Sequence, residues 1–189
     1  VIMTTTARDA LLNTVVNNTG AIEARTIENQ AGAISLLGGA DGGTVSVDGT
    51  LDASAPDGGN GGLIETSGAH VHVADSTRIS TLATSGNSGT WLIDPADYTV
   101  AATNGDITGA ALGANLQTGN VTILSTQGTV NASGSGDINV NDAVTWTSGT
   151  RLTLNAINSV NINAAITNTG SPAGGGVTLR ADTNAVCVA

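Results

Sequence analysis

Short runs of alternating apolar and polar residues recur along the chain. The frame apolar-Thr-apolar occurs at 120–124, 151–155 and 176–180, and Asn takes the place of Thr at 137–141 and 159–163. Apolar residues at positions i and i+2 lie on one face of a β-strand, and the residue between them faces the other way. Each run therefore predicts a short strand with one buried face.

One apolar residue from each run returns at a nearly constant interval. Val121, Val140, Val160 and Leu179 follow one another at intervals of about 20 positions. Such an interval, with Gly and Asn between short strands, is typical of a solenoid whose coils stack on one another. We therefore predict an all-β fold, a parallel β-helix with coils of about 19–20 residues, in which these four side chains form one buried column.

Asparagine is frequent in the C-terminal runs. Asn tolerates left-handed backbone angles, and its side-chain amide can bond an identical side chain in the next coil. We expect such contacts among the asparagines at positions 139, 141, 155, 158, 161 and 163.

Helical spacing competes with the strand pattern near the N-terminus. Ala7, Leu11 and Val15 recur at intervals of four residues, which predicts a short helix within 7–16. Weaker helical spacing at 107–116 favours a loop or a short helix there.

A second departure gathers Trp91, Pro95 and Tyr98 in one segment. Because proline interrupts a strand ladder, residues 89–118 are predicted to form an irregular insertion or bulge. The expected organisation is β-helix coils at 1–88, the insertion at 89–118 and regular coils at 119–189. We interpret these parts as one continuous solenoid, cut from a longer chain.

The composition supports a narrow β-core. The 189 residues include 26 glycines, two Trp, one Tyr and no Phe, and the apolar 40% is mostly Ala, Val, Ile and Leu. The formal charge is −10, and the five basic residues are scattered arginines, at positions 8, 25, 78, 151 and 180. Nucleic-acid binding needs clustered basic residues, so we exclude nucleic acid as a partner.

The single cysteine, Cys187, excludes an intrachain disulfide and has no identifiable catalytic partner. No apolar run approaches the roughly 20 residues of a membrane helix, so we predict no membrane insertion.

Two polar motifs are candidates for binding sites. The glycine-dense run 57–62 lacks the Lys of a phosphate-binding loop and the tandem repeats of a calcium-binding solenoid, so it is interpreted as a turn. His70 and His72 share one strand face near Asp75, but no third ligand recurs at coil spacing. We expect a solvated strand face there, and no metal site.

Two further motifs are candidates for polysaccharide chemistry. Asp94 and Asp97 would suit an acid pair, but no neighbouring residues supply the cleft and the shifted pKa that catalysis requires. Trp146 is interpreted as a strand residue or part of an exposed stripe, and not as a sugar platform. We therefore predict no enzymatic activity, no catalytic residues, and no cofactor or metal.

Several motifs resemble the large filamentous haemagglutinin-like exoproteins of Gram-negative bacteria. The most specific is Gly-Thr-Trp-Leu-Ile-Asp-Pro-x-Asp-Tyr-Thr-Val at 89–100, and the segments at 105–110, 120–123 and 136–146 continue the similarity. Residues 10–25 and 49–56 look like the part of these proteins that follows their secretion domain. We expect the secretion domain itself to lie outside this sequence.

The resemblance implies a right-handed parallel β-helix that is secreted to the cell surface through an outer-membrane β-barrel transporter. It also implies a role as an adhesin or as a stalk for a toxin, with partners among host-cell or neighbouring-cell receptors or glycans. The function expected is thus a structural and adhesive segment of a secreted filament. The alternatives are a polysaccharide-binding or polysaccharide-cleaving β-helix and, less favoured because Thr-x-Thr does not recur at coil spacing, an ice-binding surface.

Overall fold

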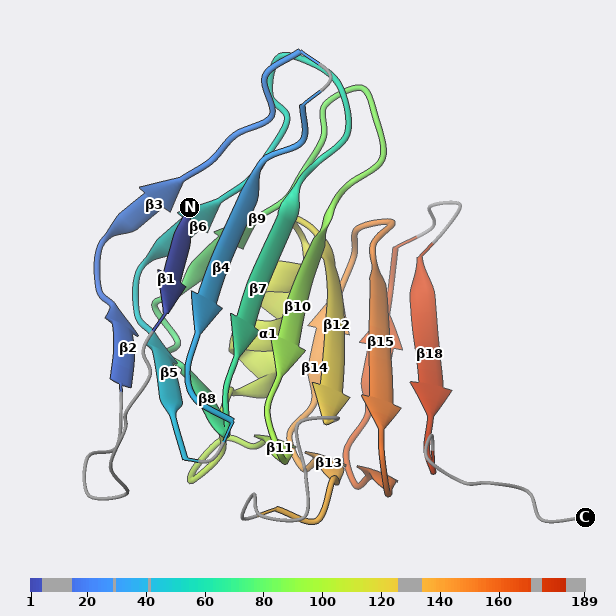
Figure 1. Ribbon diagram of the computed structural model, residues 1–189. Coiled ribbons are helices and arrows are strands. Elements are labelled where there is room, and N and C mark those ends of the chain that lie inside the picture. The colour runs from blue at the N-terminus through green and yellow to red at the C-terminus, as the bar shows by residue number, and fades with distance from the viewer. Residues whose placement is uncertain (5–14, 29, 41, 126–133, 171–174, 183–189) are drawn as a thin grey trace, which may run out of the picture.

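The chain winds through successive coils whose first strands line up in one seven-stranded parallel sheet (Figure 1). The computed structural model describes residues 1–4, 15–28, 30–40, 42–125, 134–170 and 175–182. The seven-stranded sheet, called the long sheet below, contains β1 (Ile2–Thr4), β4 (Ala33–Leu37), β7 (Leu63–Ser67), β10 (Thr90–Asp94), β12 (Asn120–Ser125), β15 (Arg151–Ala156) and β18 (Gly176–Arg180).

The remaining elements form the other sides of the coils. The second elements make two parallel three-stranded sheets: β2 (Val15–Asn18), β5 (Thr44–Val47) and β8 (His70–Val73), then β11 (Tyr98–Val100), β13 (Ile138–Val140) and β16 (Val160–Ile162). The third elements are β3 (Ala21–Glu23), β6 (Thr50–Asp52) and β9 (Arg78–Ser80), then α1 (Gly109–Leu116), then the pair β14 (Val144–Trp146) and β17 (Ile166–Asn168). The named strands all pair in parallel, so the predicted β-solenoid is confirmed.

The predicted coil length is wrong, because the coils are longer than the repeat interval read from the sequence. In the long sheet Val121 pairs with Leu152, and Leu152 pairs with Val177. Val140 lies in another sheet, where it pairs with Ile162. The interval read from the sequence therefore joined strands on different sides of the solenoid, because one coil contains three strands with similar alternation.

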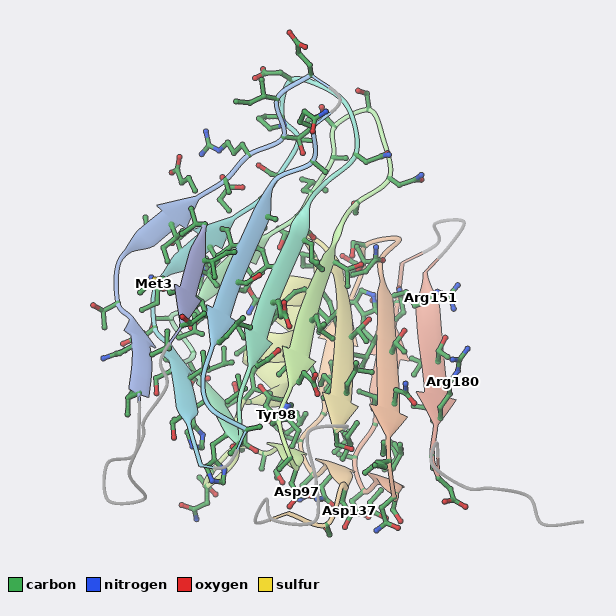
Figure 2. The ribbon with its side chains drawn as sticks, viewed as in Figure 1. Met3, Asp97, Tyr98, Asp137, Arg151 and Arg180 are labelled. Atoms are coloured by element: carbon green, nitrogen blue, oxygen red, sulfur yellow. The ribbon has the colours of Figure 1, made fainter. Side chains whose placement is uncertain are left out.

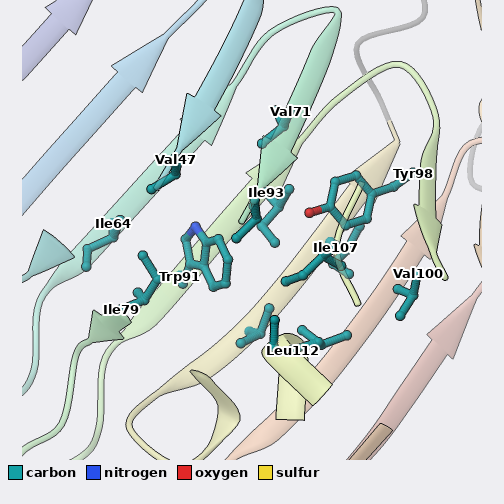
Figure 3. Close-up of a cluster of buried hydrophobic side chains, with 14 of the residues drawn as sticks. Val47, Ile64, Val71, Ile79, Trp91, Ile93, Tyr98, Val100, Ile107 and Leu112 are labelled. Carbon is teal, nitrogen blue, oxygen red and sulfur yellow. The ribbon is translucent and has the colours of Figure 1, made fainter. Parts of the chain in front are cut away.

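The core is a set of inward-facing columns. One column of the long sheet has side chains whose exposed fraction does not exceed 1%, namely Ile34, Ile64, Trp91, Val121 and Leu152. Figure 3 shows Trp91 and Ile93 packed with Val71 and Ile79 from other sides of the coil. Because full burial of such a side chain contributes about 1.5–3 kcal/mol, adjacent coils stabilise one another.

Four of the six asparagines make the expected contacts, between the coils that contain β13 and β16, whereas Asn158 donates to Asp137 and Asn155 pairs in register with Arg180. Asn161 donates its side-chain amide to Asn139 at 2.9 Å, and Asn163 donates to Asn141 at 2.7 Å. Both pairs span 22 residues; Asn139 and Asn161 lie in β13 and β16, and Asn141 and Asn163 directly follow these strands. They join neighbouring coils by side-chain hydrogen bonds in addition to the backbone ladder.

Helix α1 occupies the place of a strand between β9 and β14, so residues 107–116 contain the short helix that the weaker spacing allowed. Thr108 caps it by accepting the N–H of Ala111 at 3.1 Å. Asn115 accepts the N–H of Ile79 at 2.8 Å, and Thr118 donates to the carbonyl of Ile79 at 2.6 Å. These two side chains therefore satisfy backbone groups of β9 that another strand would otherwise pair.

The structure also differs from the sequence predictions at 7–16 and at 89–118. Most of the helix predicted within 7–16 lies outside the described residues, but its last two, Val15 and Val16, belong to strand β2. The insertion predicted at 89–118 is wrong at its start, because β10 pairs in register with β7 and β12. Pro95 follows the last residue of β10, so it ends the strand without interrupting the ladder.

Candidate functional site

The second side of the solenoid contains two separate sheets, one ending at β8 and the next beginning at β11. The chain at 105–107 lies there: the N–H of Val73 donates to the carbonyl of Asp106 at 2.8 Å, and the N–H of Asp106 donates to Thr99 at 2.8 Å. Val100 and Ile107 form an isolated parallel bridge beside it. We call this junction, made by residues 72–73, 99–100 and 105–107, the seam.

A contact between His72 and Asp106 lies on the outer side of the seam. His72 Nδ1 lies 3.0 Å from Asp106 Oδ1, and Asp106 Oδ2 accepts the N–H of Thr99 at 2.8 Å. The carboxylate of Asp106 thus contacts both strands that border the seam. The hydrogen bond and charge of Asp106 raise the pKa of His72 above its usual value, against the opposing effect of partial burial.

A shallow groove of about 240 Å³ runs beside this pair. Its lining comes from β5, β8 and the loop at the seam, namely Ser46, Val47, Asp48, His72, Val73, Ala74, Gly105 and Asp106. The Asp48 carboxylate accepts a hydrogen bond from the Ser76 hydroxyl. The groove therefore combines one histidine with two carboxylates, so acidic groups outnumber basic ones in its lining.

The two histidines lie as the sequence predicts, on a solvated strand face. Both His70 and His72 are exposed on β8. Asp75 does not join them, because its carboxylate accepts the hydroxyl of Thr108 at 2.6 Å, next to α1. Within the described residues, no group of three or more His, Cys, Asp or Glu side chains is arranged to hold a metal ion.

Asp97 has a defined structural role. Its carboxylate accepts three backbone N–H groups, from Ser135 at 3.0 Å, Gly136 at 2.7 Å and Asp137 at 2.9 Å. Figure 2 shows Asp97 and Asp137 close together below the long sheet, where β11 and β13 begin. Asp94, the other member of the acid pair considered and rejected from the sequence, is 8% exposed. The carboxylate of Asp97 therefore caps the turn that leads into β13.

The glycine-dense run 57–62 is a turn, as predicted, between β6 and β7. Gly58 and Gly59 have φ angles of 113° and 87°, which favour glycine. A Cβ on Gly61 would lie 1.8 Å from the carbonyl oxygen of Thr81. The glycines thus allow turns of neighbouring coils to stack in contact.

Both tryptophans lie in the core. Trp91 is 1% exposed and donates its indole N–H to Thr66 at 3.1 Å. Trp146 is fully buried in β14 and donates to the carbonyl of Thr150 at 3.1 Å. Trp146 is therefore a strand residue, one of the two interpretations left open, and neither indole offers a platform for sugar rings.

Sequence reasoning missed an ordered polar surface on the outer face of the long sheet. Thr122 of β12 pairs with Thr153 of β15, which pairs with Thr178 of β18. These residues alternate with buried neighbours along β12 and β15, so the three threonines form one outward column. The repeated apolar-Thr-apolar frame contains these three threonines. The predicted coil length was too short, so it did not align them with one another.

Cys187 and residues 183–189 around it lie outside the described residues. In the described part of the chain, no helix has the length and apolar character needed to cross a membrane. Comparisons of the chain with protein-family models, curated proteins and solved structures found no match.

Proposed function

We propose that this chain is a structural and adhesive segment of a secreted bacterial surface filament. The observation that carries the proposal is the long sheet, in which the same inward and outward columns continue from one coil to the next. Each coil buries its apolar face against its neighbours, so the stack resists bending as a unit. A segment of this kind holds a more distant region away from the cell.

The outer face of the long sheet supports adhesion. Its side chains repeat at the spacing of adjacent strands, about 4.8 Å, and include the threonine column of β12, β15 and β18. Repeated weak contacts on one rigid body gain strength when several act together. Such a face suits an extended ligand on another cell or on a host surface.

The carboxylates support a role without catalysis. Asp97 is held by three backbone N–H groups, and Asp52 by the Arg25 guanidinium and the N–H of Ser54. Both therefore serve the fold. The seam groove brings His72 and Asp106 together, but its open shape does not enclose a substrate.

The motifs at 89–100 and 136–146 that resemble filamentous haemagglutinin-like exoproteins support the secreted location. On this proposal, the chain is exported through an outer-membrane β-barrel transporter and meets receptors or glycans on host or neighbouring cells. Polysaccharide binding is compatible with the same outer face.

Adhesion is tested by retention of protein-coated beads under flow. Beads that carry this chain should remain on cell layers or glycan-coated surfaces at shear stresses that remove beads coated with an unrelated protein of equal net charge. Soluble protein should compete for the same surfaces. Equal loss of both kinds of bead from every surface would contradict an adhesive role, and release of products from a glycan panel would contradict a non-enzymatic one.

A further inference from the structure

The last strands of the long sheet differ in charge from the rest of the chain. Between positions 143 and 181 there is no Asp or Glu, whereas Arg151 and Arg180 both lie there. The strands β12, β15 and β18 carry no acidic side chain, although β7 and β10 contain Glu65 and Asp94. One end of the long sheet is therefore basic in a protein whose formal charge is −10.

The two arginines lie on the same outward face as the threonine column. Arg151 begins β15 and Arg180 ends β18, where it pairs in register with Asn155. Both arginines are exposed, and Figure 2 shows them beside β18. We call this surface the Arg-Thr face; its residues are Asn120, Thr122, Arg151, Thr153, Asn155, Thr178 and Arg180.

Hydrogen bonds order part of this face. The side chain of Asn120 accepts the N–H of Arg151 at 3.0 Å, and Arg151 Nη1 donates to the Thr178 hydroxyl at 3.3 Å. The Arg151 side chain is therefore directed over the adjacent strand. The arginine positions are fixed by a β-sheet, which is more rigid than a loop.

The other two described arginines are used differently. Arg25 Nε lies 2.7 Å from Asp52, and its Nη2 lies 3.5 Å from Glu23. Arg78 donates to the backbone carbonyls of Asp75 and Thr77. Arg25 is neutralised by carboxylates, and Arg78 is engaged by backbone carbonyls. Asp182 follows Arg180 by two residues but lies outside β18, so the Arg-Thr face itself carries two arginines and no carboxylate.

The chemistry of the face defines a ligand class. Guanidinium groups match carboxylates in shape and charge, while Thr hydroxyls and Asn amides both donate and accept, as sugar hydroxyls require. The Cα atoms of Arg151 and Arg180 are one strand and four residues apart, roughly 14 Å. An extended chain with repeated charges fits this separation better than a single small anion does.

We propose that the Arg-Thr face binds an acidic polysaccharide whose repeating sugars carry carboxylates. The inference rests on the proposed adhesive function and names the ligand class and the surface. The face has no aromatic side chain on which a nucleic-acid base could stack, so a polysaccharide is favoured over single-stranded nucleic acid.

The test measures binding of polygalacturonate to the intact chain and to its variants. Carboxyl-reduced polygalacturonate, a neutral polymer of the same linkage, is the matched ligand control. We expect the double variant Arg151→Gln/Arg180→Gln to lose about tenfold or more in affinity for the acidic polymer, since charged hydrogen bonds are lost. The variant Arg78→Gln, which removes one positive charge elsewhere, should bind like the parent, and added salt should weaken binding.

Melting curves show whether each variant keeps its fold; because both substituted side chains are exposed, we expect unchanged midpoints. If the double variant does not fold, the single variants Arg151→Gln and Arg180→Gln replace it, each with a smaller expected loss. Equal affinity for the neutral polymer, equal loss in Arg78→Gln, or tighter binding of single-stranded DNA would each overturn the proposal. Bead retention that is undiminished in the double variant would reject this ligand and surface while leaving the adhesive function standing.

Discussion

The carboxylate of Asp97 accepts the backbone N–H of Gly136 at 2.7 Å, across 39 residues of sequence. It also accepts the N–H groups of Ser135 and Asp137. One side chain after β10 therefore caps the turn before β13. Such a contact joins two coils that are also connected through the paired strands β11 and β13.

Removal of this cap should destabilise the solenoid. In Asp97→Asn one carboxylate oxygen becomes an NH₂ group, which faces backbone donors in place of an acceptor. We expect the free energy of unfolding to fall by about 1–3 kcal/mol, measured by urea denaturation. Asp57→Asn, an exposed change in the glycine-dense turn, is the matched control and should have little effect. Equal stability of the two variants would show that the cap contributes nothing.

Because Thr66 accepts a hydrogen bond from Trp91, we expect two substitutions of Thr66 to differ in their effect on stability. Thr66→Val preserves the shape of the side chain but leaves the buried indole N–H of Trp91 without this acceptor. A loss of about 1–3 kcal/mol is expected from the urea midpoint. Thr66→Ser keeps the hydroxyl and should cost less, so a greater loss in Thr66→Ser would contradict this assignment.

Close contact of α1 with β14 predicts that added volume is harmful. A Cβ on Gly113 would lie 2.4 Å from the carbonyl oxygen of Thr145. Alanine favours a helix over glycine by about 1 kcal/mol, but Gly113→Ala should still lower the melting temperature because the helix must shift. At the exposed helix position Ala114, Ala→Gly should show the propensity cost alone. An increase in melting temperature in Gly113→Ala would show that the helix can move freely.

The ion pair at the seam predicts a pH-dependent contribution to stability. Asp106 raises the pKa of His72 in the folded state, so the contribution is complete below the unfolded pKa near 6.5 and is lost as pH rises through the raised value. Because the side chain is 54% exposed, we expect a contribution below about 1 kcal/mol. The difference in melting temperature between the parent and His72→Gln should therefore narrow with rising pH.

His70→Gln is the control for this titration, since His70 lies on the same strand face without a described ion pair. A gap between parent and His72→Gln that widens above neutral pH would have the wrong sign for this mechanism.

Because the hydroxyl of Tyr98 is buried, we expect its removal to leave stability unchanged or to increase it. Tyr98 is fully buried, and its oxygen has no hydrogen-bond partner in the described structure. Burial, with a smaller effect of the Asp106 charge, holds its pKa well above the usual value. Tyr98→Phe removes the unsatisfied group and keeps the ring, so the melting temperature should stay equal or rise. A clear decrease would reveal a partner for the hydroxyl.

The alternation of residues such as Val121 and Thr122 was sufficient to predict short strands with one buried face, and the recurrence of this frame along the chain predicted that the strands stack in a parallel solenoid. The repeat length was not predictable in the same way, because β12 and β13 have similar patterns although they belong to different sides of one coil. Pairing is decided by which strands lie side by side in space. The partners are revealed by longer intervals, such as Val121 with Leu152 and Val140 with Ile162.

The contacts at the candidate surfaces could not be predicted from the sequence either. His70 and His72 could be placed on one exposed face from their spacing alone, but the contact between His72 and Asp106 depends on the loop that enters the seam. The Arg-Thr face required the correct register, since Thr178 meets Arg151 only when β18 follows β15.

Helix α1 replaces a strand on one side of a coil, while β10 and β12 on the long sheet remain paired in register. Length and secondary structure can thus vary on the other sides without disturbing the long sheet. Insertions on those sides offer a route by which related solenoids could acquire new appendages and still transmit mechanical load along an unbroken axis.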